Sequence, residues 1–186
     1  MTLCDTRDSQ LVIVDVQERL AAVIEAERMA AMVRGCVLLL DVAAILEVPV
    51  LCTEQYPGGL GTTVTAISDH LPANTSRIPK TCFSGASAAD FRQAVLNSGR
   101  KQVVLAGIES HVCILQTAME LAQQGQAVFV VEDAVCARHA LHHRNAMARM
   151  RQAGIVVTNT ESVIFEWLRD ASHEHFRKIS ALLKGV

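Results

Sequence analysis

Three side chains able to take part in covalent catalysis follow predicted β-strands of this 186-residue chain. Asp15 ends an apolar run, Lys80 follows a shorter one, and Cys113 opens a predicted helix after a third. A thiolate is a strong nucleophile, and a helix N-terminus or a nearby lysine lowers the pKa of a thiol. A carboxylate close to the sulfur can take up the thiol proton. These residue types suit nucleophilic catalysis, and we expect a lowered thiol pKa at Cys113.

Each of these residues alone has a simpler structural interpretation. A free cysteine is usually a small buried hydrophobe, and Cys36 and Cys52 fit that interpretation. An aspartate after a strand often caps a helix, and a single lysine is usually a solvated charge. The case for chemistry therefore rests on the combination of the three residues.

The elements that must hold these residues alternate along the chain. Short apolar runs predict strands, and apolar residues spaced by three and four predict helices. The predicted strands cover residues 11–16, 48–53, 77–81, 102–108, 127–131 and 154–158. The predicted helices cover residues 24–47, 88–97, 111–124, 139–152, 161–169 and 173–184. This alternation predicts one α/β domain over residues 1–186, with a parallel sheet covered on both faces and the ligand site beyond the carboxyl ends of the strands.

Composition excludes several classes of protein. Hydrophobic residues make up 51% of the chain and charged residues 19%, which excludes a disordered chain. A net charge of −2 and an aromatic content of 4% argue against nucleic acid as a partner. No apolar stretch approaches the roughly 20 residues that span a bilayer, so we expect no membrane partner. Six dispersed cysteines without a CxxC pair, and no secretory pattern at the N-terminus, predict a cytoplasmic protein.

Four motifs give the sequence a resemblance to a known family. They are Val-Asp-Val-Gln at 14–17, Thr-Glu-Gln-Tyr-Pro-Gly-Gly-Leu-Gly at 53–61, Lys-Thr-Cys-Phe-Ser at 80–84 and Gly-Ile-Glu-Ser-His-Val-Cys-Ile-Leu-Gln-Thr-Ala at 107–118. Together they resemble the isochorismatase-like (cysteine) hydrolase family, and segment 53–61 is similar to its branch of isochorismatase domain-containing proteins. The resemblance covers residues from about 9 to 168. It implies a doubly wound, Rossmann-like three-layer fold with a central parallel β-sheet, assembled as a homo-oligomer.

By this resemblance, Asp15, Lys80 and Cys113 form a catalytic triad. Cys113 would be the nucleophile, Asp15 would take its proton and later activate water, and Lys80 would hold the thiolate and the carboxylate in place. Members with this triad hydrolyse C–N bonds of amides and ureido compounds through a thioester. The family also places a cis peptide bond before the nucleophile, here between Ile108 and Glu109, with the N–H groups of Glu109 and Cys113 as oxyanion donors.

One segment departs from the pattern of the nicotinamidases in this family. They bind a divalent metal through histidines after the second strand, and residues 53–57 of this chain contain no histidine. Glu54 alone does not supply the several ligands that such a site needs. We therefore expect neither a metal nor another cofactor, and nicotinamide is disfavoured as the substrate.

Other polar and aromatic residues near the motifs are candidates for contact with a small-molecule substrate. Gln17 is placed to orient Asp15, Arg138 to bind a carboxylate through two hydrogen bonds, and His111 lies two residues before the nucleophile. The candidates for substrate binding are Gln17, Glu54, Tyr56, Phe83, His111 and Arg138. Three further histidines are interpreted as a solvated helix face: His139, His142 and His143.

Three functions from different classes stay open. The first is a metal-independent cysteine hydrolase that cleaves a C–N bond of a small amide or ureido compound. The second is vinyl-ether hydrolysis of an isochorismate-like substrate, which needs an acid but no thiol. The third is a non-catalytic oligomeric interaction protein with a relict site. Thiol alkylation separates them, because only the first loses turnover when the cysteine is blocked.

Overall fold

A six-stranded β-sheet forms the centre of the computed structural model, which describes residues 3–184. Its strands are β1 (Ser9–Val14), β2 (Val50–Gln55), β3 (Ser76–Lys80), β4 (Gln102–Ile108), β5 (Ala127–Cys136) and β6 (Val156–Thr158). All neighbouring strands are parallel, in the order β3-β2-β1-β4-β5-β6. This order is that of a doubly wound fold, so the predicted fold class is confirmed.

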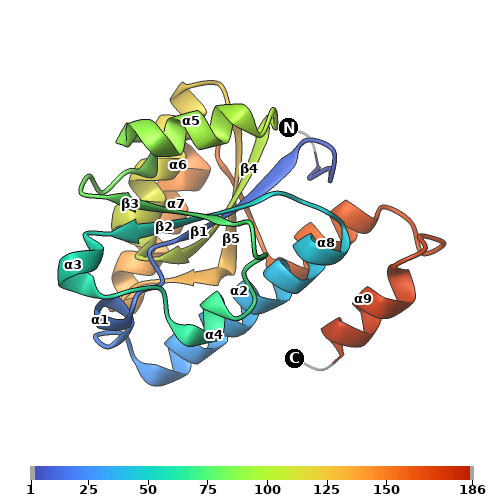
Figure 1. Ribbon diagram of the computed structural model, residues 1–186, viewed down its shortest axis with the longest axis horizontal. Helices are drawn as coiled ribbons and strands as arrows, with labels where there is room; N and C mark the ends of the chain where they lie inside the picture. The colour runs from blue at the N-terminus through green and yellow to red at the C-terminus, as the bar shows by residue number, and fades with distance from the viewer. Residues whose placement is uncertain (1–2, 185–186) are drawn as a thin grey trace.

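Helices cover both faces of the sheet and complete a three-layer arrangement (Figure 1). One face is packed by α2 (Ala26–Ile45), α4 (Thr65–Ser68), α8 (Thr160–Leu168) and α9 (Phe176–Leu183). The other face is packed by α5 (Ala89–Asn97), α6 (Leu115–Gln123) and α7 (Ala140–Gln152). Short turns named α1 (Glu18–Ala21), α3 (Pro57–Leu60), η1 (Gly85–Ser87) and η2 (Ser110–Ile114) lie between these elements. Within residues 3–184, no helix combines the length and the apolar character needed to cross a membrane.

The continuous apolar run of β1 serves two hydrophobic cores at once. Leu11 and Ile13 belong to the core on the α2 face, and Val12 and Val14 belong to the core on the α6 face. Successive side chains of a strand point to opposite faces, so a strand covered on both sides has no polar face. Each side chain buried in this way contributes about 1.5–3 kcal/mol.

Gly107 lets β4 approach β1 closely, just before the residues of interest. Its φ is +117°, and a Cβ atom built on it would lie 2.2 Å from the carbonyl oxygen of Val14. No side chain fits in that space, and glycine adopts this backbone conformation more readily than any other residue. The segments that follow the two strands are therefore held next to each other.

The structure differs from the prediction mainly in short elements. The four-residue helices α1, α3 and α4 are too short to show a helical period in the sequence. Cys113 lies in η2, a π-helical turn, and α6 begins only at Leu115. The predicted α-helical N-terminus at the cysteine is thus replaced by a wider turn, a feature often found at functional sites.

Candidate active site

Parallel strands bring the three predicted catalytic residues to one edge of the sheet. Asp15 follows β1, Lys80 ends β3, and Cys113 lies in the turn after β4. Strands β1 and β4 are neighbours where the strand order reverses. Ligand sites of doubly wound folds lie at this point, outside the carboxyl ends of the strands.

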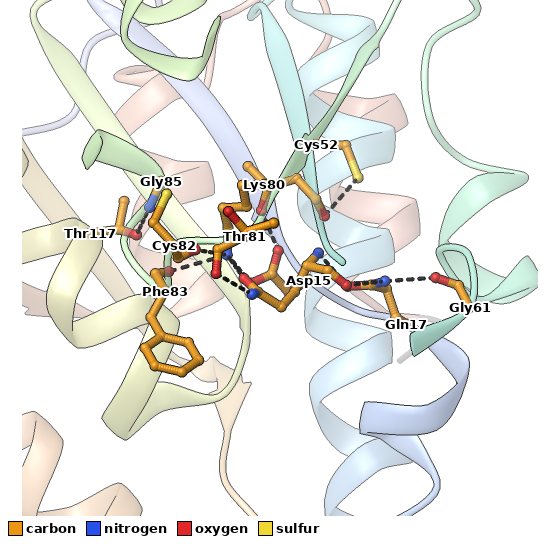
Figure 2. Close-up of polar contacts among 12 residues, drawn as sticks. Asp15, Gln17, Cys52, Gly61, Lys80, Thr81, Cys82, Phe83, Gly85 and Thr117 are labelled. Carbon is orange, nitrogen blue, oxygen red and sulfur yellow. Dashed lines mark hydrogen bonds and ion pairs between the residues drawn. The ribbon is translucent and has the colours of Figure 1, made fainter. Parts of the chain in front are cut away.

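Asp15 and Lys80 form an ion pair whose side chains are fully buried. The Nζ atom of Lys80 donates to Oδ2 of Asp15 at 2.6 Å and to Oε1 of Gln55 at 2.7 Å. It also faces the carbonyl oxygens of Cys82 at 3.3 Å and Phe83 at 3.1 Å (Figure 2). Burying a charge costs several kcal/mol unless its hydrogen bonds are satisfied, and Lys80 has more acceptors than hydrogens. The ammonium group is thereby fixed beside Asp15.

Two residues of β2 that sequence reasoning missed complete this arrangement. Thr53 donates its hydroxyl to Oδ1 of Asp15 at 2.7 Å, and Gln55 accepts from Lys80. Positions 53 and 55 share one face because side chains alternate along a strand. That alternation at the end of a predicted strand was the signal available in the sequence.

Glu54, between them, faces away from this cluster. Its Oε1 accepts from the backbone N–H of Thr63 at 2.8 Å and from the Thr63 hydroxyl at 2.7 Å. Glu54 therefore anchors a neighbouring loop, and it is not placed for the substrate contact predicted from the sequence.

Gln17 also holds the backbone rather than the Asp15 carboxylate. Its Nε2 donates to the carbonyl oxygens of Gln55 at 3.0 Å and Gly61 at 2.6 Å, and its Oε1 accepts from the Gln55 N–H at 2.6 Å (Figure 2). It reaches Asp15 only through its backbone N–H, which donates to the Asp15 carbonyl at 2.8 Å. The predicted role in orienting the carboxylate falls to Thr53 instead.

Cys113 is 5% exposed, and the pKa of its thiol is raised to about 12. Burial is the largest cause, followed by the negative charge of Asp15, while Lys80 acts in the opposite direction. Hydrogen bonding to Asp15 raises this pKa further. The lowered pKa expected from the sequence is therefore wrong. Desolvation is invisible in the sequence, and the lysine charge is largely neutralised by its partner.

Glu109 contributes both a backbone and a side-chain contact at this edge. The peptide bond between Ile108 and Glu109 is cis, as the resemblance implied. Hydrogen bonding with the Glu109 backbone acts to lower the pKa of Cys113, against the effect of burial. Burial opposes ionisation of the Glu109 carboxyl, but its hydrogen bonds with Arg138 outweigh burial and lower its pKa.

Arg138 is occupied by Glu109 and is not free for the predicted substrate carboxylate. Its backbone N–H and its Nε both donate to Oε1 of Glu109 at 3.1 Å, and its Nη2 donates to Oε2 at 2.7 Å. These hydrogen bonds raise the pKa of Arg138. The loop after β5 is thereby tied to the end of β4.

His111 joins a small cluster of histidines beside this ion pair. The ring centroids of His111 and His142 are 4.7 Å apart, and those of His142 and His139 are 5.0 Å apart. Burial lowers the pKa of His111, which favours the neutral form of its ring. His139 and His142 are exposed as predicted, but His142 contacts His111 rather than water alone. Among residues 3–184, no group of three or more His, Cys, Asp or Glu side chains is arranged to hold a metal ion.

Tyr56 and Phe83 lie at the rim of the site and are 60% and 55% exposed. Tyr56 lines a surface groove of about 530 Å³ together with Lys80 and Cys82. The ring of Phe83 points outward, while its carbonyl oxygen binds Lys80 (Figure 2). Both aromatic rings are open to contact with a ligand or another molecule.

Comparison with known sequences gives consistent matches over most of the chain. The family profile described as Isochorismatase domain matches residues 9–162. Isochorismatase domain-containing protein 2A of Mus musculus is 41% identical over 146 residues, which are 78% of this chain and 69% of that protein. The secreted isochorismatase effector Isc1 of Phytophthora sojae is 36% identical over 179 residues, which are 95% of this chain and 84% of that protein.

Solved structures share the fold along nearly the whole chain. The MAR1 ribonuclease of Caenorhabditis elegans has a TM-score of 0.91 and 33% identity, covering 98% of this chain and 93% of that one. The YcaC gene product of Escherichia coli, described as an octameric hydrolase of unknown specificity, has a TM-score of 0.87 and 24% identity, covering 100% and 96%.

Proposed function

This chain belongs to the isochorismatase family, in the branch of isochorismatase domain-containing proteins, and we propose that it is a cysteine hydrolase that cleaves a C–N bond of a small amide or ureido compound. The observation that carries this proposal is the buried Asp15–Lys80 pair, which acts on the thiol of Cys113 with both of its charges. A cysteine kept only for packing needs no such pair.

The proposed reaction begins from a neutral thiol. As the sulfur of Cys113 attacks the carbonyl carbon, its proton passes to Asp15, the carboxylate whose charge acts on this thiol. The oxyanion that forms accepts hydrogen bonds from the backbone N–H of Glu109 and, by the family resemblance, from that of Cys113. Lys80 stays charged and offsets the negative charge that develops around it.

The second half of the proposed reaction returns the enzyme to its resting state. Asp15 gives its proton to the leaving nitrogen, which departs as ammonia or an amine and leaves a thioester. Water then attacks the thioester carbonyl, with Asp15 taking one of its protons. The carbon–sulfur bond breaks, the acid is released, and the thiolate recovers its proton from Asp15.

The proposal requires no metal ion, and Lys80 supports this point. The Nζ atom of Lys80 already lies 2.6 Å from Oδ2 of Asp15. Glu54, the acidic residue of segment 53–57, accepts hydrogen bonds from Thr63. The charge that a metal would supply near the carboxylate is therefore provided by the ammonium group.

Self-association and a cytoplasmic location complete the proposal. Exposed large apolar side chains support self-association, and they are Leu3, Val23, Tyr56, Phe83, Leu96, Leu141 and Phe165. All six cysteines are free thiols, which is compatible with a reducing compartment. Light scattering after size-exclusion chromatography measures the assembly directly.

The test is a screen of small amides, ureides and carbamoyl compounds for released ammonia or acid. We expect at least one compound to turn over, and Cys113→Ala to abolish that turnover while the matched variant Cys136→Ala retains it. A vinyl ether is included to test the alternative reaction on an isochorismate-like substrate. An RNA oligonucleotide is included because the MAR1 relative is described as a ribonuclease. Cleavage of either by Cys113→Ala, with no amide turned over by the parent, would refute the proposed chemistry.

A further inference from the structure

We propose that Arg138 is a positioning residue, which clamps the Glu109 carboxylate and thereby holds in place the turn η2 that carries Cys113. The inference rests on the proposed function, because it concerns the same thiol. It gives a role to an ion pair that touches the site without belonging to the catalytic triad.

The clamp joins two different strand ends. Glu109 follows β4, and Arg138 lies in the loop between β5 and α7. Three hydrogen bonds connect them, one from the Arg138 backbone and two from its guanidinium group. The Glu109 side chain is only 5% exposed, whereas that of Arg138 is 47% exposed. A partly open arginine thus secures a buried carboxylate in one orientation.

Glu109 is held at its carbonyl end as well. Its carbonyl oxygen accepts from the N–H groups of Val112 at 3.0 Å and Ile114 at 3.3 Å, on both sides of Cys113. With the carbonyl fixed by η2 and the side chain fixed by Arg138, the orientation of the residue is determined. The turn that begins at Glu109 carries Cys113, so the position of the sulfur depends on this residue.

Arg138 also pairs with the negative charge of the Glu109 carboxylate, which lies in the segment that leads to Cys113. An unpaired negative charge there would disfavour a thiolate or an oxyanion, so a loss of Arg138 combines two effects. A lysine at this position keeps the charge but loses the planar fork that makes two parallel hydrogen bonds. Arg138→Lys and Arg138→Gln therefore separate geometry from charge.

The assay is the rate at which iodoacetamide alkylates Cys113 between pH 7 and 10.5, measured by peptide mapping. A Cys82→Ser background removes the one cysteine that the structure leaves half-buried within residues 3–184. We expect Arg138→Lys and Arg138→Gln to slow the alkylation about tenfold at a fixed pH, which equals one pKa unit or about 1.4 kcal/mol. The matched control is Arg151→Gln, which removes a half-exposed arginine paired with Glu132 and should leave the rate unchanged.

Two further variants decide between positioning and charge. The double variant Glu109→Gln/Arg138→Gln lacks both charges, and the clamp predicts that the alkylation of Cys113 stays as slow as in Arg138→Gln. A return to the parental alkylation rate would show that charge alone mattered. Glu109→Gln keeps an acceptor for the arginine and should stay within about threefold of the parent. Thermal unfolding of every variant identifies any that fail to fold, and an Arg138→Lys that folds and matches the parent at all pH values would overturn the proposal.

The clamp and the proposed function fail in different ways. If no amide is turned over but the Arg138 variants still slow Cys113, the proposed function is wrong and the clamp stands. If an amide is turned over and Arg138→Lys alkylates like the parent, the clamp is wrong and the function stands.

Discussion

For individual side chains, the centre of this site is one ammonium group with four oxygen neighbours. Lys80 draws together the end of β1 through Asp15, the end of β2 through Gln55, and its own following loop through two carbonyl oxygens. Asp15 is shared in turn between Lys80 and Thr53. The carboxylate that we propose as the acid–base group is therefore positioned by the charge of Lys80 and by the Thr53 hydroxyl before any substrate arrives.

Lys80→Met should lower the free energy of unfolding by about 3–5 kcal/mol, because it leaves the Asp15 carboxylate buried and unpaired. Since Lys80 lowers the pKa of Cys113, its loss should also slow alkylation of that thiol. Urea unfolding and alkylation kinetics measure the two effects.

Asp15→Asn should have the opposite effect on the alkylation rate of the same thiol. Removing the negative charge should speed alkylation of Cys113, yet abolish turnover because the proton acceptor is gone. General unfolding cannot slow one variant and speed the other. Equal alkylation rates in both variants would show that the charges of the ion pair do not act on the sulfur.

Among the secondary-structure elements, the close approach of β4 to β1 places Asp15 and Glu109 next to each other. Val14 pairs with Gly107 in the parallel register, and each is followed within a few residues by part of the site. The paired strands have no room for a side chain at position 107. Small changes at this crossing should therefore move Asp15 and Glu109 relative to each other.

Gly107→Ala should be far more damaging than an alanine at another glycine with positive φ. Gly125, at +87°, has no atom within 4 Å of a built Cβ, so Gly125→Ala should cost only the conformational penalty of about 1–2 kcal/mol. Gly107→Ala adds a clash with the Val14 carbonyl and should prevent folding or cost several kcal/mol more. Similar unfolding midpoints for the two variants would contradict this explanation.

Across the protein as a whole, five cysteines are buried on both faces of the sheet. Burial raises the pKa of each thiol, and these cysteines are Cys4, Cys36, Cys52, Cys113 and Cys136. The ordinary thiol value is 9.0, which is the value that the unfolded chain approaches. The folded protein thus binds more protons than the unfolded chain once the pH exceeds 9.

The free energy of unfolding should therefore fall as the pH rises from about 9 towards 12. Below about pH 9, these thiols should not make the free energy of unfolding depend on pH. Each buried thiol contributes up to about 1.4 kcal/mol per pH unit. Urea unfolding at pH 7.5, 9 and 10 tests this, and Cys36→Ala should reduce the slope between pH 9 and 10. A stability that does not change over this interval would contradict the assignment of the thiols as buried and neutral.

The positions of the three residues proposed as catalytic could be predicted because they depend on chain order. Alternating strands and helices place Asp15, Lys80 and Cys113 at the carboxyl edge of a parallel sheet, whatever the details of the loops. The partners of these residues depend on finer geometry. The side chain of Thr53 lies on the face of β2 that meets Asp15 and donates a hydrogen bond to it. The side chain of Glu54 lies on the opposite face and binds Thr63 instead.

Two features were beyond the reach of sequence reasoning. Glu109 and Arg138 lie 29 residues apart and meet only because β4 and β5 are neighbours in the sheet. The direction of the thiol pKa depends on burial, which a motif does not reveal. A helix terminus and a lysine suggested a thiolate, but the burial of the sulfur and the charge of Asp15 favour the neutral thiol.

A thiol kept protonated at rest is also protected from oxidants. Peroxides attack the thiolate, and the raised pKa of Cys113 leaves very little of the thiolate form at pH 7. Cys82, the half-buried cysteine of the described residues, is then the first to meet an oxidant. The reactive sulfur would reach its oxidisable form chiefly while Asp15 holds its proton during turnover, so the idle protein should outlast the working one under oxidative stress.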